Sequence, residues 1–536
     1  MANNFVNGLD RMQWVPIAPT TNAHAAGMGF ASDWRNDKSR YPYIGQLTSN
    51  TNISFYNVVT KGWMTNAFTA LAGTFGAGAG AVFAPSRGSF GTVGSGCTAT
   101  SIVLSTALPA SVGINMLSQK GDNIGFKIRI TSNASGSAGK TEEKFIVANT
   151  EGASPTIILE SALTFIPLSG DSYELLSGRF FLLGAGALGA GSFKGLGVAT
   201  NYLENLGYTN LPTTISTDYS ALALDELYVP YDRQPGEGFI VGTSTYNNSL
   251  FFCLAATNIA SGTITGQATG GDATVLANEY RNFQIRIVED TAIPTAVGQR
   301  RIIASHTGGA SPIYTLGSSW SVTPSATAKF VIEYPNLIIL RSSATAVVYT
   351  YNYSGASITN GTNTIADDAW HTTYFANAPA VMAAGHLMIP SFGIEPDVGK
   401  NSRHSYIYSM RGGAVTMDLF NISGGTTGLW SSSIVYDGRV SPTTGSCVTY
   451  CPAGQEGRFA YVNVYTASAI NQIYRFSVKS RTMMPFTPTD WIQAGTAAVG
   501  DRIAGYAIIK SDSEVYSGVV LVSHLSTNAF EIIIQA

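Results

Sequence analysis

Charge is the scarcest property of this 536-residue sequence. Only 12% of its residues are Asp, Glu, Lys or Arg, against about 25% in a typical soluble protein. The formal net charge is −3, and no run of Lys and Arg stands out. Such a chain has no long-range field to attract phosphate groups or anionic lipid. We therefore expect neither nucleic acid nor a membrane as its primary partner.

Cysteine and histidine are also too few for a metal or disulfide framework. The four cysteines include one CxxxC pair, Cys447 and Cys451, with no second pair nearby to complete a zinc site. The six histidines are scattered, and none forms an HxH, HExxH or HxxxH arrangement. A kelch-type copper oxidase would need Tyr, Cys and His ligands, and Cys253 near Tyr246 has no companions. We predict no metal and no cofactor.

Long hydrophobic runs are missing as well. The start, MANNFVNGLDRMQW, lacks the basic residues and apolar core of a signal peptide. The nearest candidate for a membrane span is 180–200, but small residues and Lys194 interrupt it. We interpret that segment as a loop, and expect synthesis in the cytoplasm without a signal peptide.

What the sequence does contain is a series of short β-type runs. Stretches rich in β-branched and aromatic residues recur between clusters of Gly, Asn, Ser and Pro, and helical periodicity is almost absent. Examples are 126–130, 237–242, 330–333, 345–353 and 531–534. The fold class we predict is all-β. Two stretches rich in Gly and Ala, 72–81 and 184–197, read as connectors because ordering glycine is entropically costly.

One motif occurs twice, at 126–174 and 283–331. FKIRI at 126–130 matches FQIRI at 283–287, and the same separation of 157 residues pairs GASP at 152–155 with GASP at 309–312. Alternation along the first run places Phe, Ile and Ile on one face and the charged residues on the other. Arg129 and Arg286 therefore occupy equivalent positions, either as matching contacts to one partner or on the solvent side of a strand. We favour the solvent side.

Outside the copies, three segments share an aromatic strand, a polar turn and then Trp or Met. They are ISFYNVVTKGWM at 53–64, TMDLFNISGGTTGLW at 416–430 and NQIYRFSVKSRTMMPF at 471–486, and 405–410 and 458–464 read as preceding strands. These segments resemble blades of kelch-like β-propellers, in which a Trp packs between blades. At the usual blade length, the residues outside the copies suffice for about seven blades.

This resemblance implies a propeller with two inserted, duplicated β modules. The expected divisions are a first propeller segment at 1–91, module copy 1 at 92–182, a second propeller segment with its Gly/Ala-rich connector at 183–262, module copy 2 at 263–335, and a third propeller segment at 336–536.

No constellation of residues indicates catalysis. Neighbouring acids at 142–143, 289–290 and 367–368 point to opposite faces of a strand, so solvated turns or strand rims explain them. GTFGAGAGA at 73–81 lacks the Gly-Lys-Ser ending of a phosphate loop. Aromatic residues such as Trp370, beside His371, or Tyr202 and Tyr208 could stack on sugars, although packing in the core or between blades is the better reading. We predict no enzyme and name no catalytic, cofactor or metal residue.

The low charge, the abundance of Gly, Ala, Ser, Thr and Asn, and the duplicated β modules resemble structural proteins of tailed-bacteriophage tails, necks and baseplates. The resemblance implies a virion component, made in the host cytoplasm, that contacts other virion proteins and itself as a homo-oligomer. Two alternatives stay open. One is a propeller adhesin that binds or cleaves host surface glycan, and the other is a kelch-like interaction scaffold outside any virus.

Overall fold

The structure is a computed structural model, and it describes most of the chain between residues 79 and 485 together with strands nearer both ends. The described residues are 14–16, 30–31, 43–47, 52–57, 62–67, 79–86, 88–109, 112–118, 126–184, 192–199, 202–205, 210–213, 215, 219–228, 239–241, 244–246, 252–266, 276–309, 311–342, 345–381, 383, 385–390, 405–438, 440–443, 446–450, 459–464, 472–477, 480–485, 502–511, 514–523 and 529–535.

The described residues confirm the all-β prediction. They form antiparallel strands throughout, interrupted by a single-turn 3-10 helix at Pro294–Ala296. No helix among them is long and apolar enough to cross a membrane.

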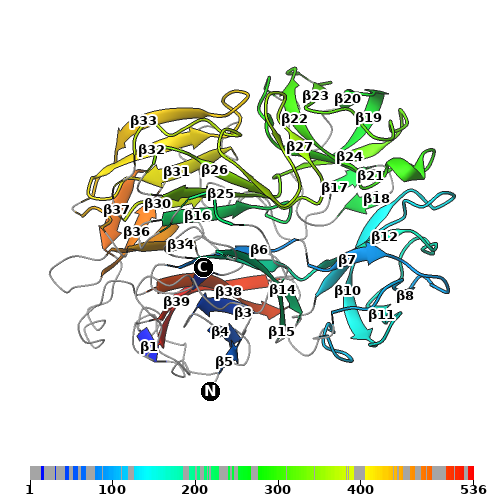
Figure 1. The fold of residues 1–536 in the computed structure, drawn as a ribbon, viewed down its shortest axis with the longest axis horizontal. Helices are drawn as coiled ribbons and strands as arrows, with labels where there is room; N and C mark the ends of the chain where they lie inside the picture. The colour runs from blue at the N-terminus through cyan, green and yellow to red at the C-terminus, as the bar shows by residue number, and fades with distance from the viewer. Residues whose placement is uncertain are drawn as a thin grey trace.

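Six four-stranded antiparallel sheets make up the larger part of the described structure (Figure 1). We number them sheet 1 to sheet 6 in chain order. Strands are given in spatial order. Sheet 1 consists of β2 (Phe30–Ala31), β3 (Tyr43–Leu47), β4 (Asn52–Asn57) and β5 (Gly62–Ala67), and sheet 2 of β6 (Gly80–Ala84), β13 (Arg179–Leu183), β14 (Phe193–Ala199) and β15 (Tyr202–Asn205). Sheet 3 consists of β16 (Tyr219–Leu224), β25 (Leu337–Ser342), β26 (Tyr349–Asn352) and β29 (Ala369–His371), and sheet 4 of β30 (Leu387–Pro390), β31 (Tyr406–Met410), β32 (Thr416–Asn421) and β33 (Leu429–Val435). Sheet 5 consists of β34 (Cys447–Tyr450), β35 (Phe459–Val464), β36 (Gln472–Ser477) and β37 (Thr482–Pro485), and sheet 6 of β38 (Arg502–Ser511), β39 (Glu514–Ser523), β40 (Ala529–Gln535) and β1 (Trp14–Pro16).

The first strands of the six sheets form a closed circuit. Strand β2 contacts β6, β6 contacts β16, and the series continues through β30, β34 and β38, which contacts β2 again. Sheet 6 takes its fourth strand from the other end of the chain, because β1 pairs with β40. The ends of the sequence are thereby joined within one sheet.

A close approach of backbone to side chain marks one step of this circuit. A Cβ on Gly80, at the start of β6, would lie 2.5 Å from the ring of Tyr219 at the start of β16. A larger residue at this position would displace the Tyr219 ring where these two strands meet.

The duplicated motif forms two modules with the same strand order. The first module, residues 90–176, has the order β7-β12-β9-β10-β11-β8, and the second module, residues 252–333, is a closed barrel in the corresponding order β19-β24-β21-β22-β23-β20. An isolated bridge between Val93 and Leu104 brings the two edge strands of the first module together. The strands are β7 (Phe90–Thr92), β8 (Ser101–Val103), β9 (Lys127–Thr131), β10 (Thr141–Asn149), β11 (Thr156–Leu159) and β12 (Ser172–Leu176), and β19 (Phe252–Ala260), β20 (Thr263–Gly266), β21 (Gln284–Glu289), β22 (Arg300–His306), β23 (Ile313–Leu316) and β24 (Lys329–Glu333).

The repeated turn has the same geometry in both modules. The hydroxyl of Thr150 accepts a hydrogen bond from the Thr156 N–H at 2.8 Å, and that of Thr307 accepts one from the Ile313 N–H at 2.9 Å. Gly152, in the same turn of the first module, has φ 108°, and its counterpart in the second has φ 101°. The Gly-Ala-Ser-Pro signature is thus a turn that needs glycine at its left-handed position.

Both modules are inserted at the same point of a four-stranded sheet, between its first and second strands. The first module lies between β6 and β13 of sheet 2, and the second lies between β16 and β25 of sheet 3. Two short hairpins complete the described fold: β17 (Phe239–Val241) with β18 (Ser244–Tyr246) and β27 (Ile358–Thr359) with β28 (Thr364–Ile365).

Several expectations from the sequence differ from this arrangement. Six four-stranded sheets lie among the described residues, whereas the usual blade length predicted about seven blades. The presumed loop at 180–200 and the connector at 184–197 contain strands β13 and β14, which pair in register between β6 and β15. The connector at 72–81 overlaps β6. The strand pattern also differs from the expected module boundaries, since β13 belongs to sheet 2 and β19 to the second module.

Large aromatic side chains pack where adjacent sheets meet. Trp370 on β29 of sheet 3 packs edge-on against Phe193 on β14 of sheet 2, with ring centroids 5.0 Å apart. Trp430 on β33 of sheet 4 lies under the guanidinium of Arg341 from sheet 3, 5.2 Å from its ring centroid. The packing role expected for Trp370 is confirmed.

Candidate functional site

Arg129 and Arg286 are buried at the junction between the two modules. Arg129 lies on β9 and Arg286 on β21, each the middle strand of a three-stranded set that includes β12 or β24. Their relative exposures are 2% and 3%. The expectation that they lie on the solvent side of their strands is therefore wrong. Strand alternation does place each arginine on the face of its strand that points away from the core of its own module, but the other module covers that face.

The modules touch through backbone as well as side chains. The Asp290 N–H donates to the Gly139 carbonyl at 2.8 Å, and an isolated antiparallel bridge joins Lys140 to Glu289. Gly139 has φ 69°, and a Cβ there would lie 2.1 Å from the carbonyl oxygen of Asp290. No larger residue fits this contact without moving one module.

Seven charged side chains meet at this junction, and we call them the junction cluster. They are Arg129, Glu143, Glu174, Glu226, Arg286, Arg300 and Glu333. Arg129 binds Glu143 at 2.8 Å and Glu174 at 2.9 Å, both within the first module. Arg286 binds Glu333 at 2.9 Å within the second.

Glu226 is the centre of the junction cluster. Its side chain is fully buried and forms ion pairs with Arg129 of the first module and with Arg300 of the second, the latter at 3.1 Å. Arg286 lies 4.0 Å away. The backbone N–H of Glu226 donates to the side-chain oxygen of Asn336 at 3.0 Å, which fixes the segment after β16 in place. One carboxylate thus holds arginines from both modules.

The cluster sets the protonation of its own members. Burial alone would raise the pKa of Glu226, but Arg129, Arg300 and Arg286 hold that pKa well below its usual range. Burial would lower the pKa of Arg129, yet Glu226 and its other carboxylate partners raise it further above its ordinary value. Burial raises the pKa of Glu333, against the opposing effect of Arg286 and with a further contribution from Glu226.

The residue before Glu226 connects the cluster to sheets 2 and 3. The Asp225 carboxylate accepts hydrogen bonds from the Ser86 N–H and hydroxyl, at 3.2 and 2.8 Å, and from the Leu227 N–H at 2.9 Å. The Tyr353 hydroxyl lies 3.0 Å from the same carboxylate. Burial raises the pKa of Asp225 to about 7, with the Leu227 N–H opposing the shift and Glu226 adding to it.

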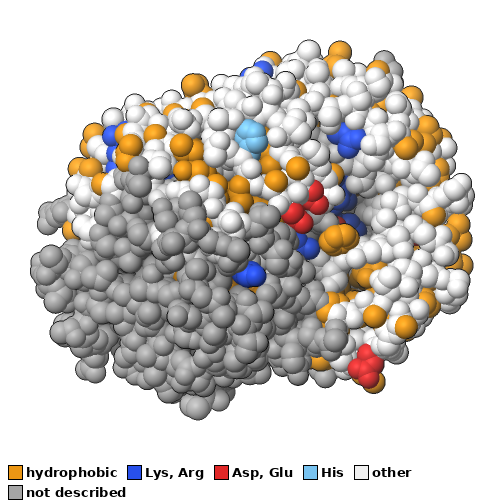
Figure 2. All heavy atoms as spheres, in the orientation of Figure 1, with side chains coloured by type: hydrophobic (Ala, Val, Ile, Leu, Met, Phe, Trp, Pro, Cys, Tyr) orange, Lys and Arg blue, Asp and Glu red, His pale blue; other side chains and the backbone are white. Residues whose placement is uncertain are grey.

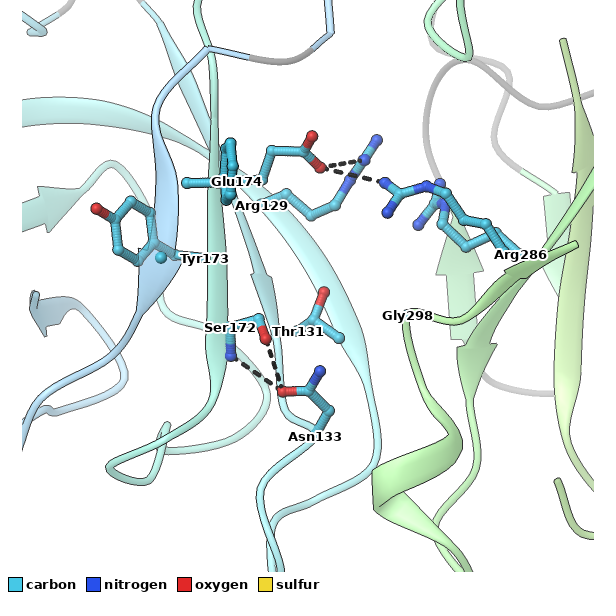
Figure 3. A pocket seen from close by; sticks show the side chains of 11 residues that line it. Arg129, Thr131, Asn133, Ser172, Tyr173, Glu174, Arg286 and Gly298 are labelled. Carbon is cyan, nitrogen blue, oxygen red and sulfur yellow. Dashed lines mark hydrogen bonds and ion pairs between the residues drawn. The ribbon is translucent and has the colours of Figure 1, made fainter. Parts of the chain in front are cut away.

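A pocket of about 180 Å³ opens beside the cluster, between the modules (Figure 3). The first module contributes strands β7, β9 and β12, and the second contributes the segment from Gly298 into β22 together with β21. The lining residues are Phe90, Gly91, Arg129, Thr131, Asn133, Ser172, Tyr173, Glu174, Arg286, Gly298 and Arg300. Figure 3 shows Glu174 reaching from one wall towards the arginine side chains of the other.

Figure 2 shows positively and negatively charged side chains in a hollow of the surface between the two modules. Elsewhere on this face charged groups are sparse, in keeping with the composition. On this face, charged side chains therefore gather mainly at the junction.

Other residues noted in the sequence do not converge on a site. Glu142 binds Thr164, and Asp290 is buried and accepts from Ser325. The interpretation of the acidic neighbours as solvated rims is therefore wrong for Asp290, and also for Glu143, which belongs to the junction cluster. Among the described residues, no group of three or more His, Cys, Asp or Glu could hold a metal ion. Cys451 and Tyr208 lie outside the described residues. So do the side chains of Cys253, Tyr246 and Tyr202.

Sequence reasoning missed Glu226 altogether. It lies outside both copies of the repeat, in the plain segment LALDELYVP. The one available signal was an exchange of charge between the copies, since Glu143 of the first corresponds to Arg300 of the second. Surfaces that carry opposite charges at equivalent positions can pair with each other.

No family model matches the chain, and no curated protein matches it. Among solved structures, Sqt1 of Saccharomyces cerevisiae aligns with 97% of this chain and 100% of its own, at 7% identity and a TM-score of 0.30. A post-proline cleaving enzyme from Rickettsia typhi aligns with 90% of this chain and 47% of its own, at 6% identity and a TM-score of 0.21. Likenesses this distant support no inference about activity. The fold is all-β, as the strand pairing described above shows.

Proposed function

We propose that the chain is a structural component of a tailed-bacteriophage virion, in the tail, neck or baseplate, that acts through protein contacts in a multisubunit assembly. In this proposal the six sheets are the blades of a kelch-like propeller. The closed circuit of first strands supports this, because a propeller places the first strand of every blade around a central axis.

The observation that carries the proposal is the pairing of the two modules. They are inserted at the same step of consecutive sheets and are joined by buried ion pairs and backbone hydrogen bonds. Burying ionised groups is costly unless their geometry is well fixed. The junction cluster therefore holds the modules in one mutual orientation, and together they present one preorganised docking surface, which lowers the entropic cost of association.

The weakly charged surface fits the same role. A component that assembles at high local concentration gains stability from burial of its surface against neighbours and does not need disulfides. Cys97 and Cys447 are free thiols in the described portion of the chain. A closed ring of subunits would use each propeller as one segment.

The test is to locate the protein in particles. Antibodies raised against the purified full chain are applied to phage particles from the source of the sequence and visualised with gold by electron microscopy. Label confined to one position on the tail, neck or baseplate supports the proposal, and a discrete homo-oligomer in sedimentation velocity supports the assembly role. Particles that carry no label, with a chain that stays monomeric at every concentration, would contradict it and leave the non-viral scaffold in its place.

A further inference from the structure

The pocket between the modules has hydrogen-bond donors that no described protein acceptor uses. Arg286 is only 3% exposed, and its Nε and Nη2 donate to Glu333 at 2.9 and 3.1 Å. Arg300 uses Nε and Nη2 towards Glu226 and Glu174. The Nη1 groups of both arginines make no hydrogen bond to any described residue, and both side chains line the pocket. A bound molecule with oxygen acceptors would satisfy them.

Charged groups of both signs surround the pocket. The junction cluster holds three arginines and four glutamates, of which the three arginines and Glu174 line the pocket. An anion in the pocket would face Glu174, which lines it, and a cation would face three guanidinium groups. A neutral molecule that both accepts and donates hydrogen bonds avoids both penalties.

The remaining lining residues match a sugar ring. Asn133, Ser172 and Thr131 supply short polar groups on the wall formed by the first module, and Ser172 already pairs with Asn133 at 3.0 Å. Phe90 lies at the edge of the pocket with 57% of its surface exposed, although a large apolar side chain is usually buried. One face of a sugar ring is made of C–H groups, and it can cover such an aromatic ring and remove both from water.

The size of the pocket limits the ligand. A volume of about 180 Å³ is more than ten times the ~10–15 Å³ that a cavity needs to hold one water molecule, which is room for one sugar ring. The walls come from both modules, so a ligand there would contact both at once.

We propose that the pocket between the modules binds one neutral sugar residue of a glycan, through the Nη1 groups of Arg286 and Arg300 and the ring of Phe90. This site adds a receptor-binding activity to the assembly role and does not depend on it. Labelling of particles would be unchanged if the pocket bound nothing, and sugar binding would be unchanged if the protein were absent from virions.

The test uses the full chain and defined probes. Neutral monosaccharides (glucose, galactose, mannose, rhamnose and N-acetylglucosamine) are titrated in saturation-transfer NMR and calorimetry, alongside N-acetylneuraminic acid and inorganic phosphate. We expect saturable binding of at least one neutral sugar. Phe90→Ala should weaken it by about tenfold, equivalent to about 1.4 kcal/mol. Phe90 is exposed, so this variant should fold normally.

The matched control is Ile166→Ala, which removes another exposed apolar side chain of the first module, 60% exposed and outside the pocket lining. It should leave sugar binding unchanged. Arg300→Met provides a second variant, expected to abolish binding, and a thermal melt of each variant reports whether it folds. The proposal is overturned if no neutral sugar binds, if the charged probes bind in preference, or if Phe90→Ala and Ile166→Ala have equal effects.

Discussion

Replacing Glu226 by Gln tests whether the junction cluster holds the modules together. The substitution keeps the shape of the side chain and one oxygen acceptor but removes the negative charge that faces Arg129 and Arg300. Both arginines keep other partners, Glu143 and Glu174 among them. The variant therefore tests the fully buried carboxylate that holds arginines of both modules, while Glu174, which also contacts Arg129 and Arg300, is kept.

The expected cost is large because the group is fully buried. Removing one partner of a buried ion pair typically costs ~3–5 kcal/mol, since it leaves an uncompensated buried charge. The retained amide oxygen places Glu226→Gln at the lower end, at about 3 kcal/mol. The matched control is Lys329→Gln, which breaks the partly exposed pair with Glu289 at 2.8 Å in the second module. Such a pair is worth about 0–1 kcal/mol.

Hydrogen exchange followed by mass spectrometry is the suitable assay, because a chain of this size need not unfold in two states. Peptides covering β9 and β21 should lose about two powers of ten of protection in Glu226→Gln, while peptides of sheet 5 should not change. The pKa of Glu226 is depressed in the folded protein, so its contribution is present above the ordinary carboxyl pKa and disappears as the pH falls towards the folded value. If Glu226→Gln and Lys329→Gln reduced protection equally, the cluster would not join the modules.

Three further predictions follow from the same structure. Gly139→Ala should open the module junction, because its Cβ would lie 2.1 Å from the Asp290 carbonyl oxygen. The control is Gly136→Ala in the same hairpin, which is also at positive φ but has nothing within 4 Å of its Cβ, so it should cost only backbone strain of about 1–2 kcal/mol. Hydrogen exchange at the Asp290 amide should be faster in Gly139→Ala and unchanged in Gly136→Ala. Burial lowers the pKa of His306 from 6.5 to about 4, so the stability that this neutral side chain contributes is lost as the pH falls from about 6.5 to 4. The free energy of unfolding, measured by urea titration across that range, should depend less on pH in His306→Gln than in the unmodified protein. Equal dependence on pH in the two proteins would contradict the assignment. Deleting residues 1–17 removes β1 and leaves β40 as an exposed sheet edge, so the truncated chain should aggregate on size-exclusion chromatography where the full chain does not.

Much of the fold could be predicted because strand alternation and turn residues are local signals. The runs at 405–410 and 458–464 correspond to β31 and β35, and the repeat at 126–174 and 283–331 to matching strands in two modules. The Gly/Ala-rich segment at 184–197 was misread because small residues in a central strand look like a linker. Strand β14 tolerates them because pairing with β13 and β15 fixes its register. Its larger residues Phe193 and Leu196 pack among other large side chains in the core.

The junction could not be predicted for a different reason. Alternation says which face of β9 carries Arg129, but not what covers that face, because the cover comes from residues far along the chain. Local patterns give no information on such contacts. The burial of Arg129 and Arg286 thus follows from where the modules are inserted, which only the three-dimensional structure shows.

The duplication itself explains why the central carboxylate lies outside it. Strands β13 and β25, which follow the two modules, begin at Arg179 and Leu337. These two starting points are separated along the sequence by nearly the same number of residues as Arg129 and Arg286. Each module therefore leads into the second strand of its sheet in the same way. Two copies set side by side on consecutive sheets bring their equivalent arginines, which carry like charges, to the same carboxylate, Glu226. The entrance to the second module is not included in the repeat and differs in length from that of the first. It carries Glu226, and the carboxylate that neutralises a repeated arginine can be fixed there without having a counterpart in the other copy.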